Sequence, residues 1–208
     1  GATDVTTFTV NQADLGAGGT NSSVVGTSNT TDALVAADTI LDLSSTSLTG
    51  IEILQAGSAS ATTFKVNQAD LASGGTIVGD TTVTTDTITA MDTQLNLTST
   101  TLTDVEVLKA GKSTATTFTV DLADLTVGGT DSSVLGSTGN DTLSIKGTSF
   151  DLTSTALTSV EKLQAGLATA TTFTVDAADL AASGSVIGST GTDTLVVNDS
   201  AIDLTSTT

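Results

Sequence analysis

The chain has 208 residues and a formal net charge of −18, with 23 acidic residues against five lysines. Because lysine and arginine supply the affinity of most nucleic-acid-binding proteins, this charge argues against nucleic acid as a partner. It also opposes docking on anionic lipid. Histidine, cysteine, tyrosine, tryptophan and proline are absent, so acid–base chemistry could draw only on Asp, Glu and Lys.

The phrase Thr-Thr-Phe-x-Val recurs four times, with its phenylalanines at Phe8, Phe64, Phe118 and Phe173. The spacing is nearly constant, at roughly 55 residues, and a period of this size indicates one structural unit that is copied and stacked. We therefore predict a single repeat array with units at about 1–56, 57–110, 111–165 and 166–208, the last of them incomplete. The chain starts and stops inside a unit, so we expect a processed product or part of a longer array.

Each unit begins with the strand around its phenylalanine, and we expect these four rings to lie in the core, stacked in register. A helical turn is expected at 120–125 and its equivalents. The glycine-bearing stretch that follows is predicted to be loop, because the distance from each phenylalanine to the next recurring aspartate varies from copy to copy. These stretches hold Gly18-Gly19, Gly74-Gly75, Gly128-Gly129 and Gly184.

The rest of each unit is predicted to be packed, because the distance from the recurring aspartate to the following repeat phenylalanine never changes. It is the same from Asp32 to Phe64, from Asp86 to Phe118 and from Asp141 to Phe173. The apolar residues of this block come in short clusters, which in the third copy are Leu143, Ile145, Phe150, Leu152, Leu157, Val160 and Leu163.

Apolar pairs two residues apart are typical of strands with one buried face. A unit of this size is too small for an immunoglobulin-like sandwich, which needs ~100 residues. We therefore predict an all-β fold, a β-solenoid (parallel β-helix or β-roll) with two long or three short coils per unit.

Two segments carry a motif with chemical potential: Gly136-Ser-Thr-Gly-Asn140-Asp141 and Gly188-Ser-Thr-Gly-Thr-Asp193. They resemble the calcium-binding nonapeptide Gly-Gly-x-Gly-x-Asp-x-apolar-x of repeats-in-toxin (hemolysin-type) proteins. This resemblance implies Ca²⁺ as a cofactor, held through these residues. Asp32 and Asp86 would take part in the first two copies, where the spacing from glycine to aspartate is longer.

In that interpretation the glycines permit a tight turn with positive φ, and the aspartate supplies the carboxylate. The residues allow an alternative, in which each aspartate accepts hydrogen bonds from backbone amides of the turn. Other acidic positions also recur, and we interpret them as solvated or turn-capping carboxylates, with further cation sites as the alternative. They are Asp14, Asp70, Asp124 and Asp179, then Glu52, Glu106 and Glu161, then Asp42, Asp151 and Asp203.

A wider resemblance involves residues 151–166, which read Asp-Leu-Thr-Ser-Thr-x-Leu-Thr-x-Val-Glu-x-Leu-x-Ala-Gly. This segment is similar to repeats of large bacterial surface and repeats-in-toxin adhesin proteins. The resemblance implies a secreted structural protein, extracellular or at the bacterial cell surface, as a surface layer, filament, matrix or adhesin stalk.

Open solenoid ends expose strand edges, which favours head-to-tail or lateral self-association, and a cell-surface glycan is a further candidate partner. We predict no enzymatic activity, because no acidic pair is confined to one copy. We also predict no membrane span, because no run of ~20 apolar residues occurs. The alternative function is a Thr-rich solenoid that binds ice or a crystal surface.

Overall fold

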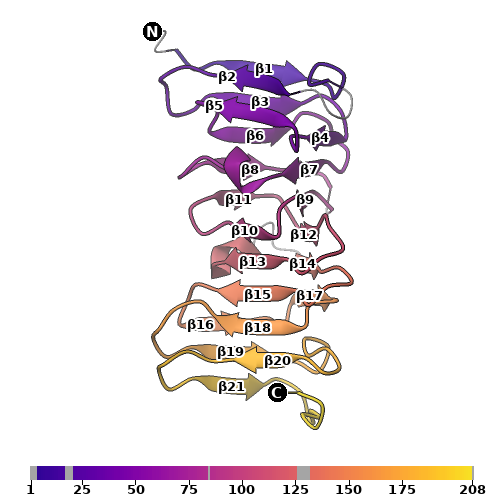
Figure 1. The fold of residues 1–208 in the computed structure, drawn as a ribbon, viewed down its shortest axis with the longest axis vertical. Coiled ribbons are helices and arrows are strands. Elements are labelled where there is room, and N and C mark those ends of the chain that lie inside the picture. Colours follow the sequence, from indigo (N-terminus) through magenta and orange to yellow (C-terminus); the bar gives the residue numbers. More distant parts are fainter. Residues whose placement is uncertain (1–3, 17–20, 84, 126–131, 208) are drawn as a thin grey trace.

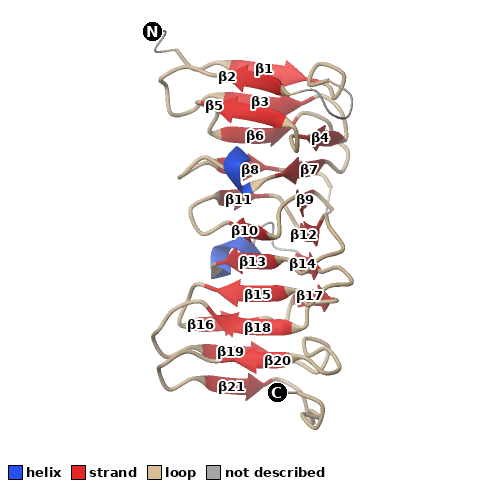
Figure 2. Cartoon of the chain, in the orientation of Figure 1, coloured by secondary structure: helices blue, strands red, loops and turns tan. Residues whose placement is uncertain are grey.

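The computed structural model describes residues 4–16, 21–83, 85–125 and 132–207. The chain winds as an elongated β-solenoid of about eight turns (Figure 1). Strands dominate throughout, and the described helical structure is limited to two short 3₁₀ turns (Figure 2). The prediction of an all-β solenoid is therefore confirmed. Two of the expected glycine loops, Gly18-Gly19 and Gly128-Gly129, lie outside the described residues.

All strand pairs are parallel and join turn to turn. One sheet has the order β1 (Thr7–Val10), β3 (Ala33–Ala36), β6 (Ile53–Ala56), β8 (Thr76–Val78), β11 (Thr101–Thr103). A second has β4 (Ile40–Asp42), β7 (Thr63–Val66), β9 (Thr87–Ala90), β12 (Val107–Ala110), β14 (Ser132–Leu135), β17 (Thr155–Thr158). A third has β10 (Gln94–Asn96), β13 (Thr117–Val120), β15 (Thr142–Ile145), β18 (Lys162–Ala165), β20 (Ser185–Ile187). Two short sheets are β16 (Ser149–Asp151), β19 (Thr172–Val175), β21 (Thr194–Val197), and β2 (Ser22–Val25) with β5 (Thr46–Thr49).

The two 3₁₀ turns are η1 (Gln68–Asp70) and η2 (Leu122–Leu125). Each occupies the place of a strand in the stack, since η1 contacts both β5 and β10, and η2 contacts β11. The short helical turn expected at 120–125 is thus confirmed as η2. With η1 counted, the second repeat has seven segments: β7, η1, β8, β9, β10, β11 and β12.

Each segment stacks on the third segment further along the chain, so one turn of the solenoid takes three segments. Seven segments divided by three gives two and one third turns per repeat. The expectation of two or three whole coils per repeat is therefore wrong. Turn length also varies, because the loops differ: the stretch of chain from Leu34 to its partner Leu54 is shorter than that from Leu108 to Val134.

Successive repeats consequently begin on successive faces of the solenoid. Phe64 pairs with Leu41 and Ile88, and Phe118 pairs with Leu95 and Leu143. The core role of the phenylalanines is confirmed, because Phe64, Phe118, Phe150 and Phe173 are all at most 1% exposed, and Phe8 packs against the same core. Their predicted stacking in register is wrong, because seven segments are not a multiple of three.

The outward residues of a sheet change along the stack for the same reason. In the second sheet Thr87, Val107 and Ser133 follow one another on adjacent strands. A face therefore shows a mixture of side chains rather than a ladder of one type. Across the described part of the chain, no helix has the length and apolar character needed to cross a membrane.

Candidate functional site

The recurring aspartate of the predicted calcium motif lies at the corner where a strand begins. In the third repeat Asp141 is fully buried. One carboxylate oxygen accepts the backbone N–H of Thr116 at 2.6 Å. The other accepts the backbone N–H of Ser137 at 2.5 Å and its hydroxyl at 2.9 Å. The carboxylate thus joins its own turn to the neighbouring turn of the solenoid.

The same arrangement recurs at Asp32, Asp86 and Asp193. Asp32 accepts the amides of Thr6 and Thr27 at 2.6 Å each. Asp86 accepts those of Thr62 at 2.5 Å and Asp80 at 2.7 Å. Asp193 accepts those of Thr171 at 2.7 Å and Ser189 at 2.6 Å. The longer spacings of the first two copies are accommodated in the loop, so the two amide contacts to the carboxylate are kept. The hydroxyl contact is kept at Asp32 and Asp193, whereas at Asp86 the residue in that place is Asp80.

At Asp32 and Asp193 these hydrogen bonds stabilise the ionised form of the carboxylate. The hydroxyl and amide of Thr27 hold the pKa of Asp32 below its usual value, and burial only partly opposes this effect. The amide of Ser189 has the same effect on the pKa of Asp193, again against burial. A buried carboxylate that accepts several N–H and O–H bonds is charged because its donors replace water.

A glutamate completes each of the first three corners from the next turn. The backbone N–H of Asp141 donates to Oε2 of Glu161 at 2.8 Å, and Glu52 and Glu106 accept from Asp32 and Asp86 at 3.0 and 2.9 Å. In the sequence alone, these glutamates form a separate set of recurring acidic positions. The spacing from aspartate to glutamate is the same in all three copies, and this constancy could have linked them, because it matches one turn of the solenoid.

The glycine of the motif is required by close backbone approach. A Cβ atom on Gly136 would lie 1.7 Å from the carbonyl oxygen of Ser159 and 2.8 Å from Oδ2 of Asp141. Gly188 is similarly tight, since a Cβ would lie 2.6 Å from Oδ2 of Asp193. The expectation that these glycines supply positive φ is wrong. Positive φ occurs one turn away, at Gly50, Asp104 and Ser159.

The donor set at these corners does not match what calcium needs. Calcium takes six to eight oxygen ligands, whereas the oxygens of Asp141 receive N–H and O–H hydrogens, and the side chain of Asn140 is exposed beside them. Among the described residues, no group of three or more Asp and Glu side chains is placed to hold a metal ion. The geometry follows the alternative interpretation of the motif, and calcium binding by this protein stays a prediction.

A second recurring aspartate lies in the Ala-Asp-Leu turns. Asp70, Asp124 and Asp179 are only 3–5% exposed, and each accepts the N–H of the residue three positions earlier at 2.7–2.8 Å. These carboxylates cap their turns as one of our interpretations predicted, but they are not solvated. Burial raises their pKa values to about 6, 7 and 6, against the opposing effect of the amide bond.

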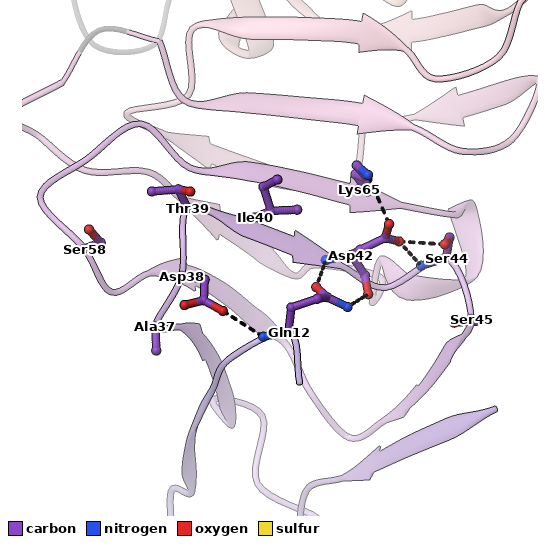
Figure 3. Close-up of a pocket in the computed structure, with 10 residues that line it drawn as sticks. All are labelled: Gln12, Ala37, Asp38, Thr39, Ile40, Asp42, Ser44, Ser45, Ser58 and Lys65. Atoms are coloured by element: carbon purple, nitrogen blue, oxygen red, sulfur yellow. Dashed lines mark hydrogen bonds and ion pairs between the residues drawn. The ribbon is translucent and has the colours of Figure 1, made fainter. Parts of the chain in front are cut away.

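An open groove lies beside the Ala-Asp-Leu turn of the first repeat (Figure 3). It measures about 850 Å³, and its wall includes Gln12, Asp38, Ile40, Asp42 and Lys65. The side chain of Gln12 bonds to the backbone of Asp42 here, as a neighbouring strand would. It accepts the N–H of Asp42 at 2.8 Å and donates to the carbonyl of Asp42 at 3.3 Å. Lys65 pairs with the Asp42 carboxylate at 3.1 Å.

The pKa of Asp42 is lowered overall: partial burial raises it, but hydrogen bonds from Ser44 and the charge of Lys65 outweigh that burial. A second groove of about 630 Å³ recurs one repeat later, beside Gln68, Gln94 and Asn96. Gln68 bridges the backbone of Asn96 in the same way, at 2.6 and 3.2 Å. Both grooves lie where an Ala-Asp-Leu turn preceded by glutamine takes the place of a strand, whereas the third and fourth repeats have Leu122 and Ala177 in place of this glutamine.

Comparison with known proteins gives no relative: no family model, no curated protein and no solved structure matches the chain.

Proposed function

We propose that the chain is a structural repeat protein of the bacterial cell exterior, of the kind that builds surface layers, filaments, matrices or adhesin stalks. The observation that supports this most is the continuous stack, in which buried apolar ladders and corner hydrogen bonds join every turn to the next. Such a solenoid resists extension along its axis and gains length by adding repeats. The likeness to repeats-in-toxin and adhesin repeats, stated above for the sequence, points to the same class.

Self-association is part of this proposal. In the described stack β1 pairs only with β3, and β21 only with β19, so each has one edge that another chain could pair with. Electron microscopy of the purified chain over a range of concentrations, with calcium and with chelator, tests this. Filaments or lateral arrays would support the proposal, and discrete particles at every concentration in both conditions would contradict self-association.

Calcium enters the proposal as a stabilising ion, and its test is separate. Circular dichroism during a calcium titration reports whether strand content depends on the ion. A calcium-dependent gain of strand would support it. Because the corner carboxylates are already bonded to amides, strand content that is complete in chelator would remove calcium as a requirement for folding.

A cell-surface glycan is the further partner that we propose, with the groove beside Gln12 as the place where it would bind. The groove combines an apolar contact at Ile40, which is 44% exposed, with hydroxyl, amide, carboxylate and ammonium groups. This mixture suits a neutral polyhydroxylated ligand, which needs both donors and acceptors, whereas the charge of −18 disfavours an acidic one. Pockets of 300–1,000 Å³ are the usual size for small ligands.

The second groove supplies the variants for a test. Ile40→Gln and Lys65→Thr introduce the residues that this groove has at the equivalent positions, Gln94 and Thr119, and should keep the fold. We expect the double variant to lose binding to neutral oligosaccharides on a glycan array. The control is Lys109→Thr, which removes an exposed lysine outside the groove. Equal binding by the parent protein, the double variant and the control would contradict the proposal that the groove is the binding site.

Binding to ice or a crystal surface is the weaker candidate. A lattice-matching surface needs a regular array of threonines on one face, whereas successive outward residues here differ, as with Thr87, Val107 and Ser133. Thermal hysteresis above that of an acidic control protein of the same size would revive this alternative.

A further inference from the structure

The corner that follows each Ala-Asp-Leu turn exists in two versions that alternate along the chain. In the first and third repeats the leucine of the turn and the next core residue lie further apart in the chain, as from Leu15 to Val24. In the second and fourth repeats they lie closer, as from Leu71 to Ile77. The longer version carries a serine at the start of the strand, and the shorter version carries a glycine.

The serine hydroxyl makes two hydrogen bonds in the longer version. Oγ of Ser22 donates to the carbonyl of Leu15 at 2.7 Å and contacts Oγ1 of Thr46 at 2.8 Å, on the next turn. Ser132 repeats this with Leu125 at 2.5 Å and Thr155 at 3.1 Å. One hydroxyl thus connects two turns inside the wall of the solenoid.

The second repeat lacks this hydroxyl. Thr76 pairs with Thr101, so Gly75 lies opposite Thr100. In the longer version the same two positions hold the serine and the threonine that face each other. Thr100 is 8% exposed, and among the described residues its Oγ1 is the one buried side-chain oxygen or nitrogen with no hydrogen-bond partner. A buried polar atom without a partner is destabilising, so such atoms usually bind water.

A cavity lies at this position. It has a volume of about 10 Å³ and is lined by Thr100, Gly75, Leu71, Asp70 and Glu52, among others. A water molecule needs about 10–15 Å³ and two to four polar partners. Thr100, Leu71 and Asp70 line the space, and Thr100 and Leu71 have the places of Thr46 and Leu15, the two residues that Ser22 joins in the first repeat.

We propose that the second repeat holds one internal water molecule that takes the place of the missing serine hydroxyl and joins Thr100 to the turn of Leu71. The site is structural and independent of the proposed function of the protein. The cavity is only partly enclosed, and its lining mixes apolar residues with Thr100, Asp70 and Glu52. Because the folded chain forms this space, the water belongs to the folded state.

A crystal structure of the chain at a resolution that shows ordered water tests the proposal directly. We expect density for one water within hydrogen-bond distance of Thr100 Oγ1, and a cavity that is clearly empty would overturn the proposal. Thermal unfolding gives a second test through Thr100→Val. If water is bound, this variant loses a hydrogen bond, and the unfolding midpoint should fall by about 2–4 °C.

The matched variant is Thr155→Val, which removes a hydroxyl whose partner is Ser132, and its midpoint should fall by a similar amount. Thr100→Ser keeps the hydroxyl and should stay near the parent protein. A midpoint for Thr100→Val that is unchanged or higher would show that Thr100 has no partner to lose, and would contradict the proposal.

Discussion

Asp32 at a corner and Asp124 in an Ala-Asp-Leu turn are both removed from water, yet their pKa values move in opposite directions. Asp32 accepts two amides and a hydroxyl, and these bonds lower its pKa. Burial raises the pKa of Asp124 to about 7, because its one amide bond, from Asp121, only partly opposes the burial and the charge of Asp121 adds to it. The number of donors, rather than burial alone, therefore decides whether a buried carboxylate supports the fold in its charged or its neutral form.

The largest expected effect comes from the glycine at the corner. Gly136→Ala would place a methyl group 1.7 Å from the carbonyl oxygen of Ser159, so the two turns must separate. We expect a loss of at least about 3 kcal/mol in the free energy of unfolding, measured by chemical denaturation. Gly147→Ala is the control, because its nearest neighbours lie at 3.8 Å. Equal loss in the two variants would contradict the role of close approach.

The corner carboxylate should come next. Asp141→Asn replaces one acceptor oxygen with an N–H₂ group, which must face the amide of either Thr116 or Ser137 because each donates to a different oxygen. Since hydrogen bonds to a charged group contribute about 1.5–3 kcal/mol, we expect a loss in this range near pH 7. Asp151→Asn is the matched control, because Asp151 is exposed and the second repeat has Asn96 at the same position. A loss of stability as small as that of the control would refute the corner model.

Mild acid should stabilise the protein through the aspartates of the Ala-Asp-Leu turns. Their folded pKa values of about 6–7 exceed the unfolded value of 3.8, so the folded state binds more protons in this range. Stability, measured by chemical denaturation across pH, should therefore rise as pH falls from 8 to about 5. Below about pH 4 it should fall, because corner groups such as Asp32 and Asp193, with lowered pKa values, must then be protonated.

Asp124→Asn isolates one of these groups. Asparagine keeps an acceptor for the amide of Asp121 but carries no charge, so we expect a gain of about 1 kcal/mol at pH 8 that disappears by about pH 5. Asp14→Asn is the control, because Asp14 has the same place in the first repeat but is exposed. A pH-independent effect of Asp124→Asn, measured by denaturation at both pH values, would show that the charge does not matter.

The smallest effect is expected at the residues with positive φ. Ser159 has φ of 54°, where the first repeat has Gly50. Ser159→Gly should relieve the steric cost of this conformation and raise the free energy of unfolding by about 0.5–1 kcal/mol. The gain is this small because glycine loses more conformational entropy on folding than serine does. Ser154→Gly, at an exposed turn position without positive φ, should be neutral or destabilising. A gain from both variants would point to another cause.

The sequence was sufficient to predict the fold class, because the period and the alternation of Leu143 with Ile145 reflect buried strand faces directly. It also identified Phe64 and Phe118 as core residues. The number of segments per turn could not be predicted in this way, because the helical turn at Gln68–Asp70 has no strand pattern and still fills one place in the stack.

The sequence indicates which positions form the corner sites, but it does not determine what their carboxylates bind. A glycine turn followed by an aspartate suits both a cation and a set of backbone amides, and only the positions of donors such as Thr116 N–H distinguish the two. Those donors lie far away in the chain, on the preceding turn. The constant link from Asp141 to Glu161 and its equivalents was visible in the sequence, but its meaning required the length of a turn.

The central claim is that the seven segments of each repeat wind on three faces of the solenoid. Each strand therefore pairs with the third segment after it in the chain, and equivalent strands of successive repeats lie on different faces. Because the chain has no cysteine, disulfide cross-linking tests this directly. Thr63 and Thr87 are paired on adjacent strands, about 4.8 Å apart, within reach of a disulfide. The account predicts that the Thr63→Cys/Thr87→Cys variant forms an intramolecular cross-link on mild oxidation, whereas Thr63→Cys/Thr117→Cys keeps two free thiols. Cross-linking of the second pair, or failure of the first in the folded protein, would contradict it.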